Sequence, residues 1–175
     1  MTVVQYAISV YREELMKSLV FSAPNEGRVK ISEEPLKIMY TFCQTKRTDT
    51  EAGGMLFGRF LIDSNDIVID VLSVPMKGDI RKRSYFHRSM KNHQDVLNRI
   101  YEESNGTCHY VGEWHTHPEN DPSPSDIDLK NWHRVMSKTL TDSNLFLFVI
   151  IGIKQIRVWQ GNKELNQLIP LALVE

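Results

Sequence analysis

Two histidines and an aspartate stand at a spacing that suits metal binding. His115 and His117 are separated by one residue at the end of a predicted strand, so both imidazoles should point to the same face. Asp128 follows in the first turn of a predicted helix, after a loop long enough to fold back. Two histidines, one carboxylate and an open fourth position are typical of a catalytic zinc site, although ligand type alone leaves other divalent ions open.

Simpler interpretations of these residues are also open. A His-x-His pair is often incidental. Asp126 and Asp128 suit the first turn of a helix on electrostatic grounds, and Ser125 suits a helix N-cap. The combination of these residue types at fixed spacing is what favours a metal site.

The combination resembles the motif of the JAMM metalloproteases. That motif has two histidines one residue apart, a serine, and an aspartate three residues after the serine; here these are His115, His117, Ser125 and Asp128. The family also has an upstream glutamate before a glycine-containing strand, which Glu51 matches. The resemblance implies a mixed β-sheet between helices and hydrolysis of peptide or isopeptide bonds after the C-terminus of ubiquitin-like proteins.

The resemblance also implies a role for each motif residue. His115, His117 and Asp128 would bind one zinc ion per chain, with water in the fourth position. Glu51 would be the general base that accepts a proton from this water and later gives it to the leaving amine. Ser125 would hydrogen-bond the oxyanion of the tetrahedral intermediate.

Hydrophobic periodicity predicts an α+β, three-layer domain around a curved, mainly antiparallel sheet. Strands are expected at 28–31, 53–62, 67–74, 108–115, 145–151 and 155–160, and helices from residue 32, over 90–103 and over 125–138. Residues 1–27 are predicted as an N-terminal extension, 28–162 as an MPN/JAMM catalytic domain, and 163–175 as a tail that packs on it. A strand is possible at Tyr6–Val10. The family resemblance makes the expected fold cytidine-deaminase-like.

Composition argues against a protein that binds nucleic acid, spans a membrane or is secreted. The chain has 175 residues, with 21 basic and 22 acidic side chains, so no overall field favours binding to nucleic acid. Its longest apolar run, near 145–153, is too short to cross a bilayer, and no secretory signal is recognised. Two cysteines, Cys43 and Cys108, fit a reducing compartment. We expect a cytoplasmic monomer that does not bind membranes.

A basic segment precedes the second predicted helix. It contains Lys77, Arg81, Lys82, Arg83, Arg88 and Lys91. These cations form either a solvated loop or a surface that docks substrate. In the second case, Ser84–His87 should offer a strand edge to the extended C-terminal tail of a protein substrate.

Within the JAMM family, the chain most resembles the small proteases of bacterial CBASS anti-phage operons. This implies cleavage after the C-terminus of a CD-NTase, a cGAS-like nucleotidyltransferase, that an E1–E2-like protein has conjugated to targets. The alternatives are a RadC-like JAB protein with an unrelated substrate and a non-catalytic MPN scaffold. Near-neutral charge argues against DNA as the substrate, and the complete ligand set argues against a scaffold.

Overall fold

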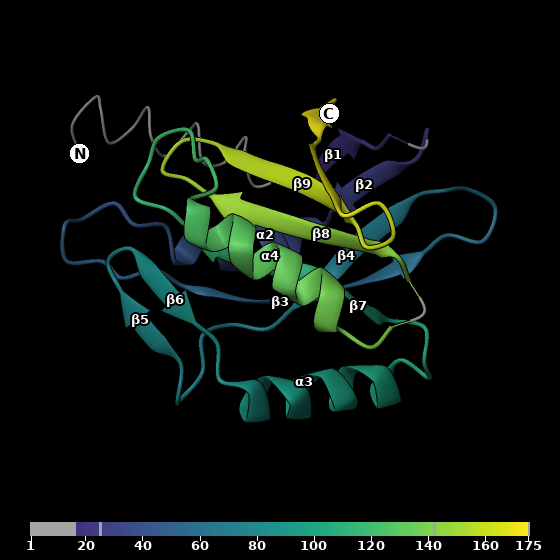
Figure 1. Ribbon diagram of the computed structural model, residues 1–175, viewed down its shortest axis with the longest axis horizontal. Coiled ribbons are helices and arrows are strands. Elements are labelled where there is room, and N and C mark those ends of the chain that lie inside the picture. Colours follow the sequence, from purple (N-terminus) through teal and green to yellow (C-terminus); the bar gives the residue numbers. More distant parts are fainter. Residues whose placement is uncertain (1–16, 25, 142, 175) are drawn as a thin grey trace.

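The computed structural model describes residues 17–24, 26–141 and 143–174, so the strand predicted at Tyr6–Val10 lies outside the described residues. Within them, nine strands form one sheet, two form a separate hairpin, and three helices pack around the sheet (Figure 1). The sheet strands are β1 (Leu19–Ser22), β2 (Arg28–Ile31), β3 (Gly53–Phe60), β4 (Ile67–Leu72), β7 (His109–Thr116), β8 (Leu145–Ile151), β9 (Ile156–Asn162), β10 (Gln167–Pro170) and β11 (Ala172–Leu173). The hairpin strands are β5 (Ile80–Lys82) and β6 (Tyr85–His87), and the helices are α2 (Glu33–Thr41), α3 (Met90–Glu103) and α4 (Asp126–Lys138).

The sheet is mixed and has β7 near its centre. The strand order is β10-β9-β8-β7-β3-β4-β2-β1-β11. The pairs β2–β4 and β7–β8 are parallel, and the other neighbouring pairs are antiparallel. This confirms the predicted α+β class with three helices. None of the described helices has the length and hydropathy needed to cross a membrane.

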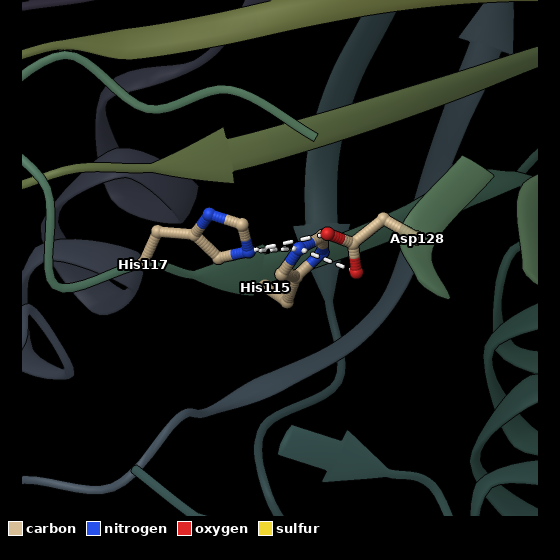
Figure 2. A group of neighbouring side chains, drawn as sticks. All are labelled: His115, His117 and Asp128. Carbon is tan, nitrogen blue, oxygen red and sulfur yellow. Dashed lines mark hydrogen bonds and ion pairs between the residues drawn. The ribbon is translucent and has the colours of Figure 1, made fainter. Parts of the chain in front are cut away.

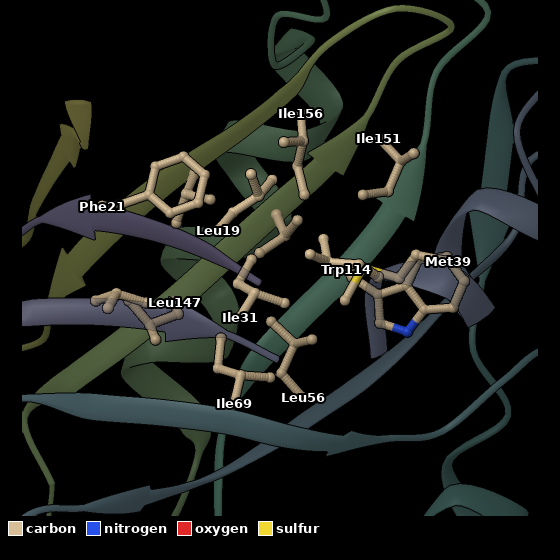
Figure 3. Packing of buried hydrophobic residues seen from close by; sticks show 14 of the residues in the cluster. Leu19, Phe21, Ile31, Met39, Leu56, Ile69, Trp114, Leu147, Ile151 and Ile156 are labelled. Carbon is tan, nitrogen blue, oxygen red and sulfur yellow. The ribbon is translucent and has the colours of Figure 1, made fainter. Parts of the chain in front are cut away.

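Helices cover both faces of the sheet, because β8 is apolar on both sides. One alternating set of its side chains packs with Leu36 and Met39 of α2, and the other packs with Trp132 and Met136 of α4. Figure 1 shows α4 in front of the sheet and α2 behind it, and Figure 3 shows the core on the α2 side. The third helix, α3, packs its apolar side against a smaller cluster that extends from β3.

A β-bulge in β7 sets which side chains face α4. The register with β3 shifts between Leu56 and Phe57, and Val111 is the extra residue opposite that step. As a result Val111 and Trp114 both join the core on the α2 side, although they are three residues apart. Trp114 is therefore a core residue, as predicted. His115 is left on the opposite face, next to Trp132 of α4.

Several short strands were predicted only in part or not at all. A strand edge was expected at Ser84–His87, which contains β6, and residues 163–175, which contain β10 and β11, were expected only to pack as a tail. β1 lies inside the segment predicted as an extension and pairs with β2 and β11, so the last strand and the first described strand meet at one edge of the sheet. The β5–β6 hairpin lies inside the basic segment. β1 is four residues long and the hairpin strands are three each, so these runs are too short to give a clear hydrophobic periodicity. β1 also pairs with β11, which is distant in sequence.

Candidate metal centre

The end of β7 and the loop after it carry the two histidines. His115 lies on β7 beside β8, and the main-chain N–H of His117 donates to Ile151 at 2.9 Å, which extends the parallel pairing by one step. The loop then returns along the β8–β9 turn, where the N–H of Ile153 donates to the carbonyl of Glu119 at 2.6 Å. These main-chain contacts fix the path that brings α4 back to the histidines.

A salt bridge and a glycine hold the same loop from its other side. The guanidinium of Arg157 binds Asp121 through two hydrogen bonds of 2.6 and 2.7 Å. Gly152 lies in the β8–β9 turn, and a Cβ atom there would crowd Pro122 and the carbonyl of Glu119. The turn and the loop can pack this closely because Gly152 has no side chain.

The first turn of α4 orients Asp128. Ser125 is the N-cap, and its hydroxyl accepts from the N–H of Asp128 at 3.2 Å. The carboxylate of Asp128 in turn accepts from the N–H and the hydroxyl of Ser125, at 2.7 and 2.6 Å. This reciprocal capping box fixes one carboxylate oxygen and turns the group toward β7. Ser125 is a cap, as its simpler interpretation proposed, and it also supports a candidate ligand.

The three candidate ligands converge on one point (Figure 2). The Nε2 atoms of His115 and His117 are 3.1 Å apart, and each lies 3.3 Å from a carboxylate oxygen of Asp128. Ligand atoms bound tetrahedrally at about 2.0–2.1 Å from one zinc ion are separated by roughly 3.3 Å. Two imidazole nitrogens and a carboxylate at this spacing fit a divalent metal.

The candidate ligands shift one another's pKa values. Burial alone would raise the pKa of Asp128, but hydrogen bonds from His115, His117 and Ser125 hold it well below its usual value. Burial likewise opposes protonation of His117, yet the adjacent carboxylate raises its pKa overall. The cluster therefore holds a carboxylate anion close to two imidazoles, a charge distribution that favours a cation.

Glu51 lies beside the ligands just before β3. It is buried, and its Oε1 atom lies 3.8 Å from Nε2 of His117. Burial raises the pKa of Glu51 to about 7, against the opposing effect of His117. A cavity of about 790 Å³ adjoins the site, and its lining includes Glu51, His115, Ser125 and Asp128. The five motif residues are thus brought together, although they come from three separate parts of the chain.

Three cations of the basic segment form hydrogen bonds or an ion pair with other parts of the chain. Arg81 donates to the main-chain carbonyl of Glu51 at 2.7 Å, and Arg83 donates to that of Lys46 at 2.7 Å. Arg88 forms a 2.5 Å ion pair with Glu113 in the wall of the cavity. The structure therefore uses these guanidinium groups to hold segments around the site, rather than leaving them free.

Sequence reasoning missed several residues that surround the site. Glu113 precedes His115 by two residues, so strand periodicity could have placed it on the same face. Strand periodicity turns Thr116 to the face opposite the histidines, where its buried hydroxyl accepts from the N–H of Ala52 at 3.0 Å and donates to Gln44 at 3.1 Å. No sequence pattern marks Gln44, which is 72 residues from Thr116 in the chain.

Comparisons with known proteins cover the whole candidate site. Residues 39–162 match the family of prokaryotic homologs of the JAB domain. A CD-NTase/cGAS isopeptidase of Escherichia coli (strain TW11681) is 38% identical over 153 residues, which are 87% of this chain and 93% of that protein. Proteins with the same name are 34% identical in Vibrio cholerae serotype O1 (strain ATCC 39315 / El Tor Inaba N16961), over 83% of this chain and 88% of theirs, and in Pseudomonas aeruginosa (strain BWHPSA011 / Pa011), over 73% and 79%.

Proposed function

The chain belongs to the prokaryotic homologs of the JAB domain, and from this membership we propose that it is a zinc-dependent isopeptidase that releases a CD-NTase from its conjugates. The convergence of His115, His117 and Asp128 beside Glu51 is the observation that carries the proposal. The names of the relatives support a CD-NTase as the substrate. Linkage of this cGAS-like nucleotidyltransferase through its C-terminus to another protein is part of the proposal.

The setting of this activity is part of the proposal. The protein acts as a cytoplasmic monomer in bacterial anti-phage defence of the CBASS type, where an E1–E2-like protein forms the conjugates that it cleaves. The cytidine-deaminase-like description of the fold is a proposal that rests on the same family resemblance.

Each site residue has a distinct task in this mechanism. His115, His117 and Asp128 would hold zinc, which supplies Lewis acidity to polarise the scissile carbonyl and to acidify water. Glu51, a buried carboxylate beside the candidate ligands, takes a proton from the attacking water and delivers it to the leaving amine. The hydroxyl of Ser125 lies at the rim of the cavity and can turn from Asp128 to donate to the oxyanion.

A free strand edge beside the site can dock the substrate tail. Among the described residues, β6 pairs only with β5, and Tyr85, Phe86 and His87 line the same cavity as Glu51. An extended C-terminal tail can add to such an edge through main-chain hydrogen bonds, with alternate side chains entering the cavity. A tail bound in this way would bring its scissile bond to the part of the cavity that Glu51 and His115 line.

Cleavage of a defined conjugate tests the proposed function. The substrate is a CD-NTase whose C-terminal carboxylate is linked to a lysine of a carrier protein, and release of the intact CD-NTase is followed by mass spectrometry. We expect wild-type protein to cut after the last CD-NTase residue, and Glu51→Gln to keep zinc but lose about 10²–10⁴ in rate. Cleavage at wild-type rate by a His115→Ala, His117→Ala double variant would refute a role for metal.

A further inference from the structure

The β5–β6 hairpin holds the main chain of Glu51. The N–H of Glu51 donates to the carbonyl of Lys82 at 2.8 Å. In the opposite direction, Nε of Arg81 donates to the carbonyl of Glu51 at 2.7 Å, and its Nη2 atom lies 3.4 Å from that of Thr50. Both main-chain groups of Glu51 are therefore bound to β5, one by the backbone and one by a guanidinium.

Ala52, the residue after Glu51, is hydrogen-bonded to the strand that carries the two histidines. The N–H of Ala52 donates to the hydroxyl of Thr116, and the N–H of Thr116 donates to the carbonyl of Ala52 at 2.9 Å. Thr116 lies between His115 and His117 in sequence. The main chain of Glu51 therefore runs directly between the hairpin and the strand that carries the histidines.

Gln44 joins these two supports. Its side-chain oxygen accepts from Thr116 at 3.1 Å, and its side-chain nitrogen donates to the carbonyl of Arg83 in the hairpin turn at 2.8 Å. Gln44 and Thr116 are almost completely buried, so water has little access to the hydrogen bond between them. The hairpin also packs directly on the start of β3, since the ring of Phe86 lies where a side chain on Gly53 would be.

We propose that Arg81 and Gln44 are positioning residues that fix the Glu51 carboxylate by tying its main chain to the β5–β6 hairpin. This inference rests on the proposed function, in which Glu51 moves the proton and the tail adds to β6. A tail bound along β6 then contacts the same hairpin that holds Glu51, so docking the substrate and placing the base depend on one support. Loss of the Arg81 contact should misplace the base while the docking strand stays available.

Arg81 offers a clean test, because its side chain is exposed and its replacement should not prevent folding. Arg81→Met removes the donor, and Arg81→Lys restores a single donor of the same charge. Arg47→Met is the matched control: Arg47 is an exposed arginine four residues before Glu51 for which the described residues provide no hydrogen bond or ion pair. Zinc content, kcat, KM and hydrogen exchange of the Glu51 amide are measured for all three variants and wild type.

We expect Arg81→Met to keep the wild-type zinc content and a KM within about twofold, while kcat falls roughly 10–100-fold, as small misplacements of a catalytic group do. The Glu51 amide should exchange about tenfold faster, Arg81→Lys should recover part of kcat, and Arg47→Met should match wild type. A second variant, Gln44→Met, should lower kcat in the same way if it folds.

Two results would overturn the inference. One is an Arg81→Met protein whose kcat and Glu51 exchange equal those of Arg47→Met, and the other is an effect confined to KM. Failure of the proposed function gives a different result, since wild type would then leave the conjugate intact. Amide exchange would still decide whether Arg81 holds the main chain of Glu51, and equal exchange in the two variants would reject it.

Discussion

At the residue scale, the candidate ligand Asp128 also belongs to a helix cap. Its carboxylate accepts two hydrogen bonds from Ser125 on one side and faces two imidazoles on the other. A single rotamer satisfies both roles, so the cap orients the ligand before any metal binds. The serine of the motif thus has a structural use that its position three residues before the aspartate already suggests.

Ser125→Ala should weaken both the helix and the metal site. We expect the metal-free protein to lose about 1 kcal/mol of unfolding free energy, because the cap is removed, and zinc affinity to fall about 10-fold or more, because Asp128 loses its support. The measurements are urea unfolding and competition with a chelator. Ser32→Ala is the control, since the N-cap of α2 makes no side-chain capping bond; an equal loss of zinc affinity in both variants would contradict this role.

At the element scale, the position of each ligand depends on a local irregularity. The bulge in β7 leaves His115 on the α4 face, and the β8–β9 turn directs the following loop back to α4. The sequence predicted the strand, the loop and the helix, because each has a clear apolar pattern or turn residues. It could not predict the bulge, since the packing of Gly112 on Leu147 arises only when β7 and β8 pair.

Gly112→Ala should disrupt this bulge. A Cβ atom at that position would collide with the main-chain oxygen of Leu147 in the neighbouring strand. We expect a loss of about 2–4 kcal/mol in unfolding free energy, measured by urea denaturation. Gly78→Ala is the control, because Gly78 and Gly112 both have a positive φ, of 97° and 153°. A Cβ atom on Gly78 would meet only side-chain atoms, at 3.3 Å or more, so the expected loss of unfolding free energy is about 1–2 kcal/mol. Equal losses would mean that strand packing at Gly112 is not tight.

A buried hydrogen-bond network of three side chains connects α3 to the end of β4. The hydroxyl of Ser73 lies 2.8 Å from Nδ1 of His93, and Nε2 of His93 lies 3.1 Å from Asp79. Burial lowers the pKa of His93 below 6.5, although Asp79 opposes this; more distant Arg88 and Glu113 act in opposite directions. For Asp79, burial would raise the pKa, but hydrogen bonds from the N–H groups of Met76 and Ser89 and from His93 lower it overall.

The lowered pKa of His93 makes stability depend on pH. The unfolded chain binds this proton more tightly than the folded chain, so the stabilisation is complete above about pH 6.5 and is lost as the pH falls below that value. Asp79, whose pKa is also lowered, causes a further loss of stability as the pH falls below about 3.8. The raised pKa values of Glu51 and His117 act in the opposite direction over this range, so the contribution of His93 is read by comparing variants. In urea unfolding of the metal-free protein between pH 5 and 8, the stability of wild type relative to His93→Gln should fall as the pH falls, and its stability relative to His109→Gln, an exposed histidine, should stay constant. An unchanged slope in His93→Gln would exclude this residue as the cause.

At the scale of the whole molecule, the site joins segments that are far apart in the sequence. Glu51 comes from the start of β3, the histidines from the end of β7 and Asp128 from α4, and the central position of β7 in the sheet brings these elements together. The motif predicted this cluster because its residue types and spacing are specific. The support from Arg81, Gln44 and Thr116 was not predictable, because it depends on contacts between segments that carry no shared pattern.

Metal should stabilise the whole fold, since its candidate ligands belong to different elements. Adding zinc at about 100 times its dissociation constant should raise the unfolding free energy by roughly 2.7 kcal/mol, provided that the unfolded chain does not bind it. Thermal unfolding with and without zinc measures this, and His115→Ala should abolish most of the shift. An equal shift in that variant would place the stabilising metal elsewhere.

Reconstitution with zinc tests the central claim most directly. Metal-free wild-type protein is titrated with zinc, and release of CD-NTase from the lysine-linked conjugate is measured at each step. The site geometry predicts that the rate rises from near zero and reaches its maximum at one zinc per chain, while Glu51→Gln binds the same single zinc without releasing product. Full cleavage by metal-free protein, or saturation in a chain that lacks both His115 and His117, would contradict the assignment of this site.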